Sequence, residues 1–176
     1  MKLRTKELIL CALFCALTAV GAQLTIPIPY GAITLQLLFM LLAGLMLPPL
    51  MSFLSMAVYV LLGLVGAPVF AGFSGGFSSI TSPTFGFVIG LALSAPLISA
   101  LFRALKKRWK LFPAALVAGL AGILVTYLCG AIYGYFVMTL VLTKEVTLWF
   151  ILWNWCLIYL PFDAAKLLAA AAITPA

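Results

Sequence analysis

Two ionisable side chains, Asp163 and Lys166, give this sequence its clearest capacity for chemistry. They lie three positions apart just after Pro161, so in a helix both project from one face. A carboxylate accepts hydrogen bonds from a ligand, and an ammonium pairs with an anionic group. Free N–H groups in the first helical turn would also favour the carboxylate of Asp163. The pair predicts a small-molecule site, with a purely structural salt bridge as the alternative.

The composition explains why this pair is conspicuous. Of 176 residues, 66% are hydrophobic and only 7% are charged, whereas a soluble domain carries roughly 25% charged residues. A chain this apolar cannot cover a globular fold with polar surface, so we predict an integral membrane protein. Ionisable side chains inside a membrane cost free energy and usually serve function.

The same composition excludes most enzyme mechanisms. The sequence has no histidine and only three acidic residues, so neither a Ser-His-Asp triad nor the usual zinc site is possible. No G-x-x-x-x-G-K string occurs, and the four cysteines show no C-x-x-C spacing. We therefore expect no metal, no cofactor and no enzymatic activity.

Further candidate site residues lie on the expected second and third helices and in the segment between the third and fourth helices. Gln36 is expected to contact a ligand or to bond another helix, and Tyr59 to stack on a ligand or simply to pack. Residues 66–82 alternate glycine, serine and aromatic residues without a helical period. We interpret residues 70–84 as a lid that closes over a ligand. Its candidate ligand contacts are Phe73, Ser82 and Thr84.

Breaks at proline and glycine divide the chain into six apolar segments, which we predict to form one six-helix membrane domain over residues 1–176. Residues 25–31 are expected to separate the first helix from the second. Residues 147–159, rich in tryptophan, are interpreted as a short separate helix near the outer surface. The expected spans are 4–24, 32–47, 50–65, 83–105, 112–142 and 161 to the C-terminus.

The net charge of +7 indicates topology rather than nucleic-acid binding. Eight of the ten basic residues fall within residues 2–6 and 103–110, which is typical of cytoplasmic loops in a plasma-membrane protein. Both termini are therefore predicted to be cytoplasmic. On the first helix, Ala12 and Ala16 form a small-xxx-small pair, which allows another helix to approach closely.

Several strings resemble the BioY family, the biotin-binding S components of energy-coupling-factor (ECF) transporters. The resemblance covers nearly the whole chain and is carried by Ile33-Thr-Leu-Gln36, Tyr59-Val-Leu-Leu-Gly-Leu-Val-Gly-Ala-Pro-Val-Phe-Ala-Gly72, Gly75-Gly76, Ser82-Pro-Thr-Phe-Gly-Phe87 and Pro161-Phe-Asp-Ala-Ala-Lys166. It implies an S-component fold that captures biotin at the outer side. It also implies docking through Ala12 and Ala16 on a transmembrane T component that works with two ATPases. Phe87 stands where the family tends to have tyrosine.

The side chains suit biotin, which has a ureido group and an anionic tail. Lys166 is expected to pair with the tail carboxylate, and Asp163 to accept from a ureido N–H or to orient Lys166. Gln36 and Thr84 would satisfy ureido polar atoms, while Phe73 and Tyr59 would pack on the rings. The alternatives are an S component for another small vitamin, a small intramembrane enzyme that uses Asp163 and Lys166, and a passive channel.

Overall fold

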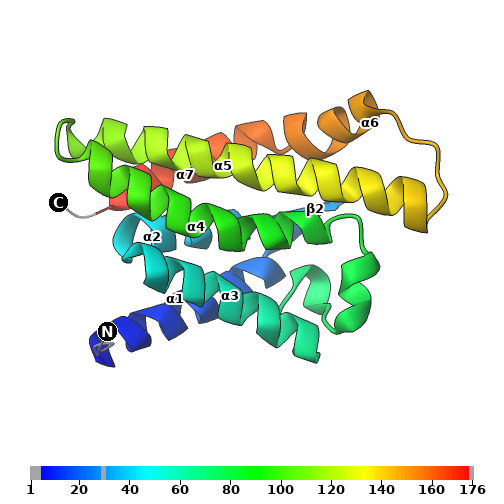
Figure 1. The fold of residues 1–176 in the computed structure, drawn as a ribbon, viewed down its shortest axis with the longest axis horizontal. Helices are drawn as coiled ribbons and strands as arrows, with labels where there is room; N and C mark the ends of the chain where they lie inside the picture. Colours follow the sequence, from blue (N-terminus) through cyan, green and yellow to red (C-terminus); the bar gives the residue numbers. More distant parts are fainter. Residues whose placement is uncertain (1–4, 29–30, 175–176) are drawn as a thin grey trace.

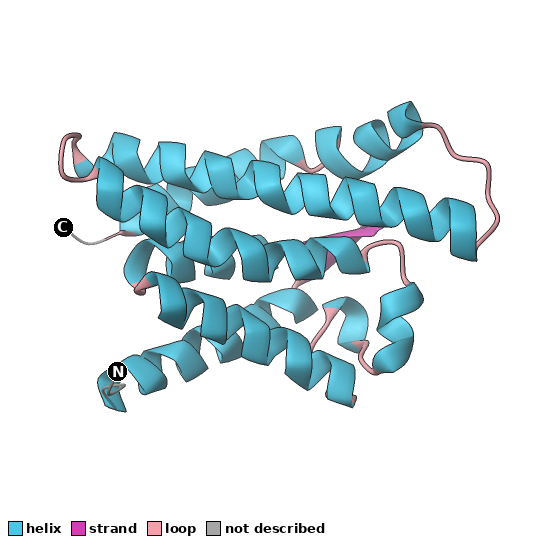
Figure 2. Cartoon of the chain, in the orientation of Figure 1, coloured by secondary structure: helices cyan, strands magenta, loops and turns pink. Residues whose placement is uncertain are grey.

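The computed structural model describes residues 5–28 and 31–174 and is almost entirely helical (Figures 1 and 2). Two expectations, the start of the first span at residue 4 and the basic residues Lys2 and Arg4, lie outside the described ranges. The helices run roughly along the long axis of the molecule and form a bundle around one main apolar core. Its centre is filled by fully buried side chains such as Met40, Leu41, Tyr59 and Ile98.

Six helical rods form the bundle in the described part of the chain, in agreement with the predicted helical membrane protein. The first four are α1 (Thr5–Gln23), α2 (Gln36–Met46), α3 (Pro49–Val65) and α4 (Phe85–Leu105). The fifth is α5 (Leu111–Phe136), extended by a π-helix, η3 (Val137–Val141). The sixth joins α6 (Leu148–Leu152), a π-helix η4 (Trp153–Leu157) and α7 (Leu160–Ile173). Four rods are long and apolar enough to cross a membrane, while α2 and α3 are shorter apolar helices.

The segment between α1 and α2 is a β-hairpin, which corrects the expected loop and moves the start of the second helix from residue 32 to Gln36. Strand β1 (Thr25–Ile28) pairs antiparallel with β2 (Gly31–Thr34). The residue before a proline is driven toward extended backbone, which holds Ile26 in the strand. The β-branched Ile33 and Thr34 also favour an extended conformation.

The tryptophan-rich segment is not a separate helix, so that prediction is wrong. It runs through η4 into α7, and residues Trp149–Ile173 form one candidate span. Pro161 has no N–H to donate to the carbonyl of Leu157, and its ring would crowd that carbonyl in a regular α-helix. The wider turns of η4 come just before this point and let the helix continue past the proline.

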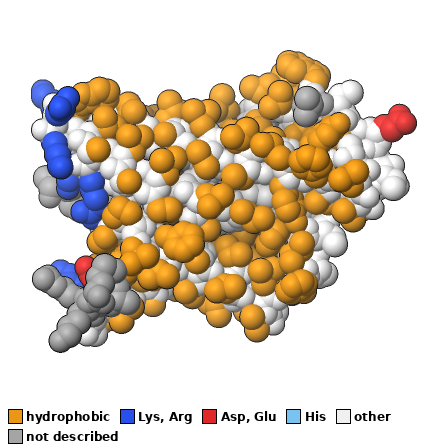
Figure 3. Space-filling model, in the orientation of Figure 1, with side chains coloured by type: hydrophobic (Ala, Val, Ile, Leu, Met, Phe, Trp, Pro, Cys, Tyr) orange, Lys and Arg blue, Asp and Glu red, His pale blue; other side chains and the backbone are white. Residues whose placement is uncertain are grey.

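The two ends of the bundle differ in charge. In Figure 3 the Lys and Arg side chains gather at one end. The start of α1, the end of α7 and the α4–α5 connection all lie at this end in Figure 1. The hairpin and two short 3-10 helices, η1 (Ala71–Phe73) and η2 (Phe77–Thr81), lie toward the opposite end. Basic residues and candidate ligand-binding segments thus occupy opposite ends of the protein.

Candidate ligand-binding site

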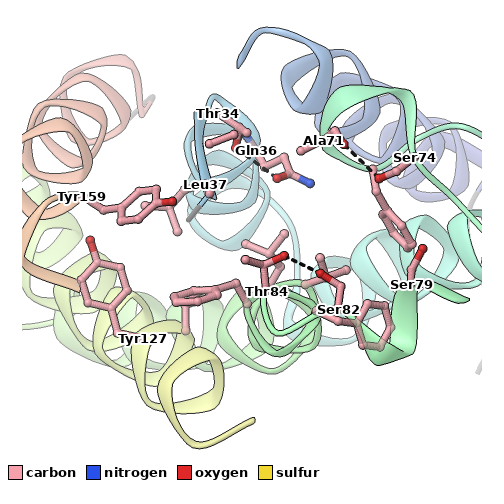
Figure 4. A pocket seen from close by; sticks show the side chains of 18 of the residues that line it. Thr34, Gln36, Leu37, Ala71, Ser74, Ser79, Ser82, Thr84, Tyr127 and Tyr159 are labelled. Carbon is pink, nitrogen blue, oxygen red and sulfur yellow. Dashed lines mark hydrogen bonds between the residues drawn. The ribbon is translucent and has the colours of Figure 1, made fainter. Parts of the chain in front are cut away.

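A cavity of about 510 Å³ lies among the hairpin, α2, the segment from Phe70 to Thr84, α4, α5 and α7 (Figure 4). This volume falls within the range of roughly 300–1,000 Å³ for small-molecule sites. Its walls are largely apolar, with polar groups that come from several different elements. The polar lining side chains are Thr34, Gln36, Ser74, Ser78, Ser79, Ser82, Thr84, Thr126, Tyr127, Tyr159, Asp163 and Lys166.

The two charged side chains predicted from the sequence meet at this cavity. Lys166 Nζ donates to Asp163 Oδ1 at 2.6 Å, and the two residues are 9% and 4% exposed. Such burial leaves few water contacts, so each charge depends on the other for stabilisation. The pair thus presents an anionic and a cationic group side by side, with no net charge.

The Asp163 carboxylate lies in the first turn of α7, as expected, and it gains a partner that the sequence did not reveal. The amide of Asp163 donates to the carbonyl of Tyr159, the residue that caps this helix, at 2.9 Å. The hydroxyl of Tyr127, on α5, donates to Asp163 Oδ2 at 2.6 Å. A tyrosine from another helix therefore adds to the support that the helix start offers.

Gln36 and Thr34 lie at the cavity wall, whereas Tyr59 lies behind it. Thr34 Oγ1 donates to Gln36 Oε1 at 3.0 Å, and the amide of Gln36 donates to the Tyr59 hydroxyl. That hydroxyl in turn donates to the carbonyl of Val69 at 3.0 Å. Tyr59 is fully buried and packs edge-on against Phe70. It therefore holds Gln36 and the 66–84 segment in place, and its ring is not among the described groups that line the cavity.

The 66–84 segment supplies three of the predicted positions, but only two of them face the cavity. Ser82 and Thr84 line it, and their hydroxyls are 3.0 Å apart. Phe73 is 72% exposed at φ 57° and lies outside the cavity lining of the described chain. The aromatic lining residue of this segment is Phe70, which is 4% exposed. Phe70 therefore takes the packing position that the sequence suggested for Phe73.

Gln23, at the end of α1, fastens this segment to the bundle and was not predicted. Its amide group donates to the carbonyls of Pro68 at 3.2 Å and Phe70 at 3.1 Å. Its carbonyl oxygen accepts from the amide of Phe73 at 2.9 Å. One side chain thus satisfies three backbone groups at and just before the short helix η1. The only sequence signal was an amide side chain at the end of an apolar helix.

Tyr127 and Tyr159 line the cavity and were also not predicted from the sequence. Figure 4 shows both rings on one side of the cavity. The Tyr159 hydroxyl reaches the Cα of Gly31 so closely that a side chain at this point of the hairpin would displace the hydroxyl. A tyrosine within an apolar span usually needs a partner for its hydroxyl, which was the one available signal.

The arrangement suits binding rather than catalysis. The site offers one carboxylate, one ammonium and several hydroxyls, with apolar walls between them. Within residues 5–28 and 31–174 there is no group of three or more His, Cys, Asp or Glu side chains that could hold a metal ion. The chemistry available is therefore recognition of a small molecule that has both polar and apolar parts.

The fold and the buried site define a multi-pass membrane protein with an S-component architecture. A solved S component for biotin from an ECF-type ABC transporter superposes with a TM-score of 0.85 and 24% identity, covering 98% of this chain and 93% of that one. The model of the BioY family matches residues 1–176, and this chain belongs to that family.

Relatives from two organisms agree with this assignment. A probable biotin transporter BioY of Pyrococcus horikoshii is 45% identical over 128 residues, which is 73% of this chain and 74% of that protein. The biotin transporter BioY of Thermotoga maritima is 36% identical over 169 residues, or 96% of this chain and 93% of that protein. Both are named as transporters, which is consistent with a chain that is not an enzyme. The relatives and the apolar spans together place the protein in the cell membrane.

Proposed function

We propose that this chain is the biotin-binding S component of an ECF-type uptake transporter. The observation that carries the proposal is the Asp163–Lys166 pair, buried at the wall of a cavity of about 510 Å³. Burial of an ion pair costs free energy unless the remaining hydrogen-bonding capacity of its atoms is satisfied by the protein or by a ligand. Membership of the BioY family supports biotin as that ligand.

The neutrality of the pair leads us to revise the role of Lys166. A biotin carboxylate placed beside Lys166 would also lie close to the Asp163 carboxylate, and the two like charges would repel. The neutral ureido group fits better, because its carbonyl can accept from Lys166 and an N–H can donate to Asp163. The fused rings would then contact apolar lining residues such as Phe70 and Phe85. The tail would point toward the hydroxyls of Ser78, Ser79 and Ser82.

This orientation predicts how biotin analogues rank in affinity. Biotin methyl ester keeps the ureido group and loses the tail charge, so we expect its Kd to rise by less than about 10-fold, as for a lost exposed charge contact. Protonated 2-iminobiotin places a cation beside Lys166, so we expect a rise of at least about 100-fold, in line with a buried unfavourable charge contact. Isothermal titration with each analogue measures both values. The reverse ranking would show that the tail carboxylate of biotin, and not its ureido group, contacts Lys166.

The gating proposal concerns the hairpin and the 66–84 segment, which together close the cavity from the end away from the basic residues. The Gln23 side chain makes three hydrogen bonds to this segment, each worth about 1 kcal/mol. We therefore expect Gln23→Ala to speed biotin dissociation by roughly 10-fold or more.

A chase of bound labelled biotin with excess unlabelled biotin measures this rate. Val20→Ala, on the exposed side of the same helix, is the matched control and should dissociate like the wild type. Equal dissociation rates for Gln23→Ala and the wild type would show that Gln23 does not hold a lid.

The transport proposal places both termini in the cytoplasm and biotin capture at the outer side. The basic end of the bundle supports this orientation, because Lys and Arg are enriched in cytoplasmic loops (Figure 3). The sequence has no P-loop string, so transport would depend on partner ATPases that act through a T component. Ala12 and Ala16 are exposed on α1 and would form the docking surface for that component.

A panel of vitamins separates biotin from other ligands of the same fold. Thermal unfolding of the purified protein with biotin, thiamine, riboflavin, niacin and pantothenate should show stabilisation by biotin alone, because a ligand stabilises the state that binds it. Stabilisation by another vitamin and not by biotin would assign this chain a different substrate.

A further inference from the structure

We infer that Tyr127 is a positioning residue for biotin recognition, because its hydroxyl fixes the Asp163 carboxylate in the orientation that a ligand meets. This inference rests on the proposed function and deepens it. Tyr127 comes from α5, 36 positions before Asp163, and lines the same cavity as Asp163 and Lys166. The partly buried Tyr127 therefore joins the buried Asp163 and Lys166 in one polar group, which α5 and α7 build together.

The two donors to Asp163 divide its carboxylate oxygens between them. Tyr127 donates to Oδ2 and Lys166 donates to Oδ1, each at 2.6 Å. A carboxylate has about four acceptor positions, two on each oxygen. Each oxygen therefore keeps capacity for a ligand N–H. Without the Tyr127 hydroxyl the carboxylate would be free to rotate and to place both oxygens on Lys166, which would remove the ligand's acceptor.

The position of the Tyr127 ring is itself fixed by packing. Its ring meets Phe87 of α4 edge-on, with centroids 6.3 Å apart and planes at 78°. Phe87 in turn occupies the space above Gly130, where any Cβ would come within 2.4 Å of its ring. Gly130 lies about one helical turn after Tyr127 on α5. The α4–α5 contact thus holds Phe87, and Phe87 limits where the Tyr127 ring can lie.

If Tyr127 is a positioning residue, its effect on biotin affinity should depend on the Asp163 carboxylate. If Tyr127 only stabilises the fold, its effect should not depend on Asp163. Tyr127→Phe removes one oxygen atom and keeps the ring against Phe87. We expect it to raise the Kd for biotin by about 10- to 150-fold, the range for a hydrogen bond to a charged group. The association rate should stay close to that of the wild type, since the cavity shape is kept, and the dissociation rate should account for the loss.

A double-mutant cycle with Asp163→Asn tests the inference. Kd is measured by isothermal titration with biotin, and ligand-free thermal unfolding is measured for every variant. In the Asp163→Asn background the further change Tyr127→Phe should alter Kd by less than about two-fold, because coupled residues give non-additive effects. Tyr135→Phe is the control: it makes the same chemical change about two turns along α5, and Tyr135 is not among the described residues that line the cavity.

Each outcome of the cycle decides the inference. Wild-type affinity in Tyr127→Phe would overturn it and leave the proposed function intact. An equal loss of affinity from Tyr127→Phe in both backgrounds would also overturn it, because the effect would not pass through Asp163. Failure of the wild type to bind biotin would overturn the proposed function and, with it, this inference. The inference would be supported if Tyr127→Phe lowers biotin affinity in the protein that has Asp163 and not in the Asp163→Asn variant.

Discussion

Replacement of Lys166 by methionine is expected to raise the Kd for biotin by roughly 10- to 150-fold, the cost of a lost hydrogen bond to a charged donor. Methionine keeps most of the apolar stem of lysine and removes the ammonium. In the wild type this group donates to Asp163 and lies at the cavity wall. Isothermal titration of purified protein with biotin measures the change.

The same substitution also leaves the Asp163 carboxylate buried without its cation, which can destabilise a protein by about 3–5 kcal/mol. The double variant Asp163→Asn/Lys166→Met removes both charges and separates the two effects. We expect it to recover most of the thermal stability of the wild type and to bind biotin as weakly as Lys166→Met, or more weakly. Lys144→Met, at an exposed position, should bind like the wild type. Wild-type affinity in Lys166→Met would rule out the ion pair as the centre of recognition.

Substitution of Ala12 and Ala16 by leucine is expected to leave biotin binding unchanged and to reduce ATP-driven uptake by about 10-fold or more, as loss of close helix packing weakens a membrane interface. Both alanines are exposed on α1, and leucine is equally compatible with lipid. The added side chains would keep a partner helix from approaching closely. Uptake of labelled biotin by cells that also express a T component and its ATPases measures the effect.

The matched control for this prediction places the same two leucines on another exposed helix face. Ala169 and Ala172 are exposed on α7, three positions apart. Leucine at these positions should leave both uptake and binding near wild-type levels. Full uptake by the Ala12→Leu/Ala16→Leu variant, or an equal loss in the α7 control, would show that docking does not depend on the small residues of α1.

The sequence predicted the charged pair and the helical membrane fold because both depend on composition. Two ionisable groups in an apolar chain must find partners, so Asp163 and Lys166 could be recognised by type and spacing alone. The S-component fold followed from the resemblance to the BioY family, and the structural comparison confirms it. The contact between Asp163 and Lys166 could be predicted without knowledge of the tertiary structure, since the two residues are three positions apart on one helix.

The residues that support the pair could not be predicted in the same way. Tyr127 reaches Asp163 across 36 positions, and Gln23 reaches Phe70 across 47. Nothing in the local pattern links either pair, because Tyr127 and Gln23 lie in the apolar parts of two helices that are far from their partners in the sequence. The contacts depend on how the helices pack, which hydrophobic periodicity does not determine.

The 66–84 segment shows the same limit at a smaller scale. Its aromatic residues predicted a lid, but the pattern could not distinguish Phe70 from Phe73. The two residues differ in backbone conformation. Phe73 has a positive φ, its N–H donates to Gln23, and its side chain is exposed. Phe70 instead fits over Gly63, where a Cβ would come within 2.1 Å of its ring. The hairpin was missed for a related reason, since the prolines at positions 27 and 29 of the sequence suggested only a helix break.

Recognition of biotin by the cavity can be measured on the isolated protein. The decisive measurement is isothermal titration of the purified wild-type chain with biotin. We expect saturable one-to-one binding that Asp163→Asn/Lys166→Met abolishes or greatly weakens. Absence of binding by folded wild-type protein, or equal binding by the double variant, would contradict it.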